Sequence, residues 1–237
     1  NVAGFKFLST STDTEKQQIV DILREAIVGL GISEPRAYFS IDQAPVLDRD
    51  FLVERHLISR HLAHAKGPRG VVIAEHETFT AMINEEDHLR LQVFKGGLQI
   101  SECWEEISKI DDLLEQKITY SFDPKYGYLT ACPTNVGTGI RVSVMLHLPA
   151  LKMTGQIEKF FNACRDMDLA VRGLFGEGTE AVGDFYQISN QITLGVGEIE
   201  IVDRFTGSIV PKIVEYELSA RAELLSRQAS MLDDKIF

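Results

Sequence analysis

Residues 71–94 read VVIAEHETFTAMINEEDHLRLQVF and establish the class of fold. Two short apolar runs, 71–74 and 78–83, lie on either side of Glu75-His76-Glu77. Residues 89–94 then alternate apolar and polar side chains, as a half-buried strand does. Three strands in succession, joined by short polar connections, predict antiparallel hairpins.

Similar signals recur along the rest of the chain. Apolar residues at helical spacing predict helices over 12–30, near 50–64, over 99–117 and 155–168, and from about 197 to the end, with a break near Gly207 and Pro211. Strands are predicted over 118–122, 128–132, 141–148, 169–175 and 184–189, whereas the polar stretch 32–50 predicts no element. We therefore expect one compact α+β domain over residues 1–237, with a largely antiparallel sheet and helices packed on one face.

The composition is that of a globular protein, with 237 residues of which 44% are hydrophobic and 25% charged. The net charge of −11 argues against a nucleic-acid partner or an anionic membrane, and no apolar run reaches the roughly 20 residues that cross a bilayer. Three cysteines without a C-x-x-C pair suit a reducing compartment, so we expect a soluble, cytoplasmic protein. Because the chain starts at Asn1 and stops at Phe237 within a helical pattern, we expect it to be truncated at both ends.

The connection Asn84-Glu85-Glu86-Asp87-His88-Leu89-Arg90 places three carboxylates in a row. Like charges in one turn repel, so they need solvent or a cation nearby. An ordinary solvated acidic turn would meet that need. Arg90, at the start of the next strand, instead suggests a cation-binding and an anion-binding element side by side.

Residues 132–141 read CPTNVGTGIR, a loop of small residues between a strand that ends at Cys132 and a strand that Arg141 begins. Gly137 and Gly139 permit a ligand to approach the backbone closely. The loop is neither a P-loop nor a dinucleotide fingerprint, because Gly-Lys-Ser/Thr and G-x-G-x-x-G are absent. On its own, Cys132 is more typical of a buried small side chain than of a reactive thiolate.

Residues 172–180 read RGLFGEGTE. Arg172 and Glu177, separated by glycines, suggest a flexible loop whose two charges contact one ligand. The alternative is a surface loop with a local ion pair worth ~0–1 kcal/mol. All three segments place an arginine at a strand boundary next to an acid or a polar loop, and this repetition favours a ligand site.

Asn84–Arg90 and Cys132–Thr138 match the two signature motifs of the ATP:guanido phosphotransferases, the creatine and arginine kinase family, and the similarity runs along nearly the whole chain. Val136, Arg172–Ala181 and the QISNQ run at 187–191 are most similar to the bacterial protein arginine kinases. The resemblance implies a guanido kinase catalytic domain with a glutamine-synthetase-like α+β fold.

The resemblance also implies roles for individual residues. Glu86 would be the base that takes a proton from the guanidinium, with Glu85 beside it and Glu177 as the second carboxylate on that group. Cys132 would be a thiolate that orients the guanidinium without forming a covalent bond. The nucleotide-binding positions that the resemblance implies are Arg90, Arg141, Val142, Ser143, Val144, Met145, Arg172, Gly173, Leu174, Phe175, Gly176, Glu177 and His61.

His61 rests on a short local motif, and a core or surface histidine would explain it equally well. The pair His61 and His64 lacks the Cys or acidic partners of a zinc site. Magnesium is expected to bind the nucleotide phosphates, with water completing its coordination shell, so no protein residue is assigned as a metal ligand.

The activity implied is transfer of the γ-phosphoryl group of ATP to the guanidinium of arginine residues in proteins, with ATP and Mg²⁺ required and ADP released. Two alternatives stay open: a small-molecule phosphagen kinase such as an arginine kinase, and a non-catalytic nucleotide-binding regulatory relative. The family's Ser-x-Arg-x-Arg strand is absent, which favours the second alternative, whereas the intact Glu85, Glu86, Cys132 and Glu177 oppose it. The small-substrate members' helical N-terminal domain is absent too, which favours a protein acceptor. A homodimer is compatible with the resemblance.

Overall fold

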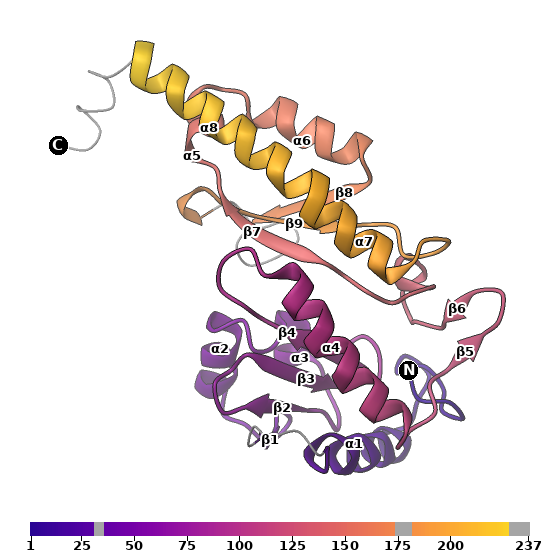
Figure 1. Ribbon diagram of the computed structural model, residues 1–237. Helices are drawn as coiled ribbons and strands as arrows, with labels where there is room; N and C mark the ends of the chain where they lie inside the picture. Colours follow the sequence, from indigo (N-terminus) through magenta and orange to yellow (C-terminus); the bar gives the residue numbers. More distant parts are fainter. Residues whose placement is uncertain (31–35, 174–181, 228–237) are drawn as a thin grey trace. The chain divides into compact units, whose positions relative to one another are not determined.

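The computed structural model describes residues 1–30, 36–173 and 182–227 of the chain. The chain forms two compact units, Asn1–Gly139 and Ile140–Phe237, and each contains its own main antiparallel sheet (Figure 1). The predicted α+β class, with antiparallel strands flanked by helices, is therefore confirmed. That the two units work as a single domain stays a prediction.

The main sheet of the first unit has the order β1-β2-β3-β4, and each neighbouring pair is antiparallel. Its strands are β1 (Arg36–Ser40), β2 (Gly70–Ala74), β3 (Phe79–Ile83) and β4 (Leu89–Val93). The hairpins predicted from residues 71–94 are confirmed. The prediction of no element over 32–50 is wrong, because residues 36–40 form the edge strand β1. The sequence does not reveal this strand, since it is short and is held by backbone pairing with β2 rather than marked by an apolar run.

Helices cover both faces of this sheet, so the prediction of helices on one face is wrong for the first unit. Val72 packs in a core with residues of α1 (Asp13–Val28) and α4 (Ile100–Glu115). Val71 and Ile73 pack instead with residues of α3 (Arg60–His64) and partly buried side chains of α2 (Val46–Glu54). All five residues of β2 and of β3 are buried, which explains their continuous apolar runs.

The prediction of a single helix near 50–64 is wrong, because α2 ends at Glu54 and a separate helix, α3, follows. His56 adopts a left-handed backbone with φ of 59°. Its N–H donates to the Val53 carbonyl, and the Leu57 N–H donates to the Leu52 carbonyl. This is the Schellman pattern of helix ends, built here on histidine instead of the usual glycine. Helix α3 then begins anew after its N-cap, Ser59.

The predicted hairpin over 118–132 is present but shorter. Its strands are β5 (Phe122–Asp123) and β6 (Gly127–Tyr128), which form a two-stranded sheet. The chain then enters a single 3₁₀ turn, η1 (Pro133–Asn135), immediately after Cys132. This hairpin therefore leads directly into the small-residue loop.

The second unit contains a three-stranded antiparallel sheet in the order β7-β9-β8. Its elements are β7 (Ser143–His147), α5 (Pro149–Met153), α6 (Ile157–Asp166), β8 (Leu169–Gly173), the 3₁₀ turn η2 (Val182–Asp184), β9 (Phe185–Asn190), α7 (Glu198–Arg204), the π-helical segment η3 (Phe205–Ile209) and α8 (Val210–Arg227). Along β7 the side chains alternate between exposed and partly buried positions, as the sequence predicts.

The long C-terminal helix is interrupted where the sequence predicts a break. The π-helical segment η3 contains Gly207, and Pro211 follows at the second position of α8. A π-bulge widens one turn and redirects the helix that follows it. Within the described ranges, no helix combines the length and apolar character that a membrane span requires.

Candidate active site

The acidic motif forms the tip of the β3–β4 hairpin. The Asn84 N–H donates to the His88 carbonyl at 3.0 Å and closes the loop. Asn84 has φ of 58°, and its side-chain Nδ2 donates to the carbonyls of Lys16 and Pro68, both at 2.9 Å. Asparagine tolerates this left-handed backbone better than most residues. The loop is therefore anchored at its base, while Glu86 at its tip is exposed.

Glu85 is buried and held on both carboxylate oxygens. Oε1 accepts a hydrogen bond from the Ser59 hydroxyl at 2.5 Å, and Oε2 accepts one from the Glu86 N–H at 2.7 Å. Arg90 Nη1 lies 3.6 Å from Oε1. The side chain is 7% exposed, so these contacts compensate for the water that the carboxylate has lost. Ser59 also caps α3 by accepting the Leu62 N–H at 3.0 Å.

Glu86 differs from Glu85 because its surroundings disfavour the ionised form of its carboxyl group. Partial loss of solvation raises the pKa of the Glu86 carboxyl, and the negative charges of Asp87 and Glu85 raise this pKa further. His61 and Arg90 act in the opposite direction. His61 lies exposed on α3, close enough to act on Glu86. Glu86 thus combines exposure with an increased tendency to accept a proton.

The Cys132 loop is closed by paired backbones. Tyr128 and Gly137 exchange N–H···O bonds of 2.8 and 3.3 Å. A Cβ at Gly127, whose φ is +77°, would stand 2.6 Å from the Gly137 oxygen, so only glycine fits this approach. The Cys132 sulfur lies 3.0 Å from the Thr134 hydroxyl, and the side chain is partly buried.

Asp87 joins this loop to the acidic hairpin. Its Oδ1 accepts the N–H of Ala131 at 2.6 Å, one residue before Cys132. The structure thereby brings together, within the first unit, Glu85, Glu86, Arg90, His61 and the Cys132 loop. Sequence reasoning missed the contributions of Ser59 and Asp87. The helix N-cap pattern after Ser59 and the position of Asp87 inside the motif were the available signals.

The predicted nucleotide residues of the second unit divide between the two faces of its sheet. The strand register aligns Met145, Gln187 and Arg172 across β7, β9 and β8, so these three share one face. Ser143 lies two residues from Met145 and shares that face, and Arg141, also exposed, precedes β7. Val142 and Val144 belong to the opposite face, which leaves chiefly their backbone for a ligand on the Arg172 face.

The remaining predicted positions follow β8. Gly173 is buried at the end of the strand. Leu174, Phe175, Gly176 and Glu177 lie outside the described residues. Their predicted roles stay predictions.

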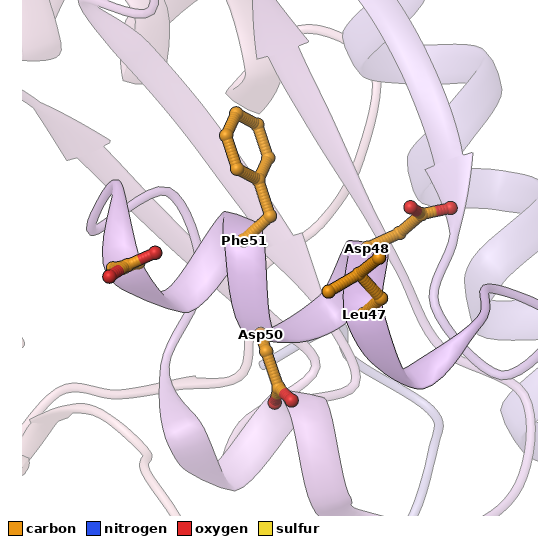
Figure 2. A pocket seen from close by; sticks show the side chains of 5 residues that line it. Leu47, Asp48, Asp50 and Phe51 are labelled. Carbon is orange, nitrogen blue, oxygen red and sulfur yellow. The ribbon is translucent and has the colours of Figure 1, made fainter.

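Two other features are distinct from this site. A hollow on the surface of α2 is lined by Leu47, Asp48, Asp50, Phe51 and Glu54, and Figure 2 shows that the labelled side chains diverge instead of converging on one point. None of the predicted site residues lines this hollow. Over the residues that the structure describes, no three His, Cys, Asp or Glu side chains are grouped as a metal site.

Comparison with known proteins places these loops in a wider context. Residues 18–220 match the family model described as the ATP:guanido phosphotransferase, C-terminal catalytic domain. The chain is 44% identical to a protein-arginine kinase of Caldanaerobacter subterraneus subsp. tengcongensis over the whole of this chain and 70% of the relative. It is 50% identical to a protein-arginine kinase of Halothermothrix orenii over 84% of this chain and 57% of that relative. These matches cover 70% and 57% of the length of the two relatives.

Solved structures show the same fold. The taurocyamine kinase of Schistosoma mansoni, a duplicated enzyme solved with components of a transition-state analogue, matches with a TM-score of 0.85 and 28% identity, over 92% of this chain and 32% of that one. A lombricine kinase matches with a TM-score of 0.81 and 26% identity, over 94% of this chain and 65% of that one.

Proposed function

The chain belongs to the ATP:guanido phosphotransferase family, as its catalytic domain, and from this we propose that it transfers the γ-phosphoryl group of ATP to the guanidinium of arginine residues in proteins. The observation that carries the choice of acceptor is the degree of identity. The chain is 44% and 43% identical to two protein-arginine kinases over its whole length, whereas it is 28% and 26% identical to the taurocyamine and lombricine kinases whose structures match.

The acceptor requires a base. An arginine guanidinium is protonated at neutral pH and is a poor nucleophile until it loses a proton. Glu86 would take this proton as the nitrogen–phosphorus bond forms and the bond from the γ-phosphorus to the leaving oxygen of ADP breaks. Its exposure at the hairpin tip and its raised pKa support this assignment.

Glu85 would support the base without exchanging protons itself. Its oxygens are engaged by Ser59 and by the Glu86 backbone, which fixes the loop that carries Glu86. Cys132 would orient the guanidinium as a thiolate, which would accept a hydrogen bond from the Thr134 hydroxyl. Glu177 is proposed as the second carboxylate on the guanidinium.

The nucleotide requires positive charge. Phosphoryl transfer depends mainly on positioning and on cations around the transferred group. We assign this role to Arg90, Arg141 and Arg172, since guanidinium forks onto two phosphate oxygens at once. Met145 and Ser143, which share the sheet face of Arg172, would line the same nucleotide, and His61 would contact it from α3. Magnesium enters as part of the MgATP substrate.

The identity of the phosphoryl acceptor can be tested by direct competition between protein arginine and free arginine. The chain is incubated with MgATP, an arginine-rich protein and free arginine together, and acid-labile phosphate is quantified on each. We expect label on the protein, and none with the matched variant Glu86→Gln. Label on free arginine alone would assign the chain to the small-molecule phosphagen kinases. Tight ADP binding without any transfer would identify a nucleotide-binding regulatory relative.

We also propose that the protein acts in a reducing compartment. All three cysteines, Cys103, Cys132 and Cys164, are free, which supports a reducing compartment such as the cytoplasm. A homodimer stays a prediction, and light scattering of the purified chain would test it.

A further inference from the structure

We propose that Asp87 is a positioning residue. It holds the Cys132 loop against the acidic hairpin, so that the Cys132 thiol and the Glu86 carboxylate can contact the same guanidinium. The inference rests on the proposed function. It assigns to the third carboxylate of the motif a task that is separate from proton transfer.

The first support is a bond between distant parts of the chain. Asp87 and Ala131 lie 44 residues apart, yet the Ala131 N–H donates to Asp87 Oδ1 at 2.6 Å. Because Ala131 directly precedes Cys132, moving this backbone N–H would move the cysteine. A charged acceptor gives the bond about twice the strength of a neutral one.

The second support is a bridge that reinforces the same contact. The Asn1 amide Nδ2 donates to Asp87 Oδ1 at 2.5 Å and to the Leu129 carbonyl at 3.0 Å. The Asn1 carbonyl oxygen Oδ1 accepts the His88 N–H at 2.9 Å. The Asn1 side chain thus ties the acidic hairpin to the segment that leads into Cys132.

The third support is the rigidity of the hairpin behind Asp87. The His88 ring is buried; its Nδ1 accepts the Val2 N–H at 3.1 Å, and its Nε2 lies 2.9 Å from the Lys6 carbonyl. Acceptance at Nδ1 leaves the proton on Nε2, which donates to Lys6. Loss of solvation lowers the pKa of His88, so the ring stays neutral in this role. Asp87 therefore projects from a fixed base.

Asp87 also acts on Glu86 through its charge. Its carboxylate is one of the groups that raise the pKa of Glu86, with Glu85 acting in the same direction and His61 and Arg90 against it. Geometry and charge can therefore be separated by substitution. Asp87→Asn keeps an acceptor oxygen at the same distance and removes the charge. Asp87→Glu keeps the charge and moves the acceptor by one methylene.

The experiment measures kcat, the KM for MgATP, the pH profile and the rate at which iodoacetamide alkylates Cys132, in a Cys103→Ser background. Asp87→Glu should lower kcat by about 10–100-fold, as expected for a misplacement of about 1 Å, with an altered alkylation rate and an unchanged KM for MgATP. Asp87→Asn should retain most of kcat and the wild-type alkylation rate. Its acid limb should move to lower pH, since the pKa of Glu86 falls.

Asp123→Ala serves as the matched control. Asp123 is likewise half-buried and accepts backbone N–H groups, but these come from Lys125 and Tyr126 in its own turn. The Asp123→Ala variant should leave kcat and the alkylation rate of Cys132 at wild-type levels. Wild-type kcat and alkylation in Asp87→Glu would overturn the positioning role. Equal losses in Asp123→Ala would overturn it too, by showing a general effect of loop loosening. An inactive wild type would reject the proposed function, and the alkylation rates would still test the link between the loops.

Discussion

Glu85 and Glu86 show how two identical side chains, adjacent in sequence, come to differ. Glu85 is buried against Ser59 and the Glu86 backbone, with Arg90 nearby. Glu86 is exposed at the hairpin tip, and partial loss of solvation together with the neighbouring carboxylates raises its pKa. Environments that divide two carboxyl groups in this way typically separate a structural or electrostatic role from proton transfer. This difference supports the proposal that Glu86, at the hairpin tip, is the base.

The pH dependence of activity follows from the environment of Glu86. A base works only when ionised, so activity falls as Glu86 takes up a proton. Because its pKa is raised above the ordinary 4.5, this acid limb should lie above that value. His61→Gln should move the limb to still higher pH, since His61 lowers the pKa of Glu86.

The measurement is kcat/KM for the acceptor as a function of pH. His64→Gln, also exposed on α3, is the control and should leave the profile unchanged. A limb that moves to lower pH in His61→Gln, or stays in place, would contradict the assigned electrostatics.

At the scale of single elements, α3 begins at a residue that serves two purposes. Ser59 caps the helix through Leu62 and donates to the buried Glu85. Ser59→Ala should lower the free energy of unfolding by about 1–3 kcal/mol, because a cap and a hydrogen bond to a buried charge are lost together. Urea denaturation measures this, with Ser59→Thr as the variant that keeps the hydroxyl. Equal stability of the alanine and threonine variants would argue against the dual role.

In the second unit, a carboxylate of α8 caps a different helix. Glu217 is buried, and its two oxygens accept the N–H groups of Ala150 and Leu151 at the start of α5, both at 3.1 Å. Arg221 pairs with it at 2.7 Å. Glu217→Ala should lower the free energy of unfolding by about 2–4 kcal/mol, because buried N–H groups lose their acceptor. Glu215→Ala, exposed on the same helix, should change it little. Similar urea midpoints for both variants would refute the cap.

Several elements could be predicted from local pattern alone. The β2–β3–β4 hairpins follow from two short apolar runs, the alternation of residues 89–94 and the polar turns between them. The start of α1 follows from the capping box, which the structure contains between Thr12 and Glu15. What failed depends on tertiary packing. The edge strand β1 has no apolar run, and the left-handed His56 that ends α2 carries no glycine signal.

The same distinction holds for the candidate site. The pairing of Arg90 with Glu85 was predictable, because both residues lie at one short hairpin. The contacts of Ser59 with Glu85 and of Asp87 with Ala131 span 26 and 44 residues, and no local pattern encodes such distances. The division of residues 142–145 between two sheet faces follows from strand alternation, although the family resemblance assigned the run as a whole.

At the scale of the whole molecule, the residues proposed to bind nucleotide are distributed over both units of the chain. Arg90 belongs to the first unit, and Arg172 belongs to the second, on β8. Arg172→Ala should weaken both nucleotide binding and transition-state stabilisation, by about 2–4 kcal/mol, because the proposed phosphate contact would be lost from a desolvated site. Calorimetry with MgADP and steady-state kinetics measure the two effects. A variant that loses kcat with unchanged MgADP affinity would remove Arg172 from the nucleotide site.

The variant Glu86→Gln tests the proposed chemistry most directly, since it removes the proposed proton acceptor and leaves the arginines proposed to bind phosphate unchanged. Phosphoarginine formed on a protein acceptor is quantified by mass spectrometry, alongside MgADP affinity by calorimetry. We expect phosphoarginine with the wild type, a loss of about 10²–10⁴-fold in kcat with Glu86→Gln, and equal MgADP affinity for both. Wild-type kcat in Glu86→Gln, or no phosphoarginine with either protein, would contradict Glu86-dependent phosphoryl transfer to arginine.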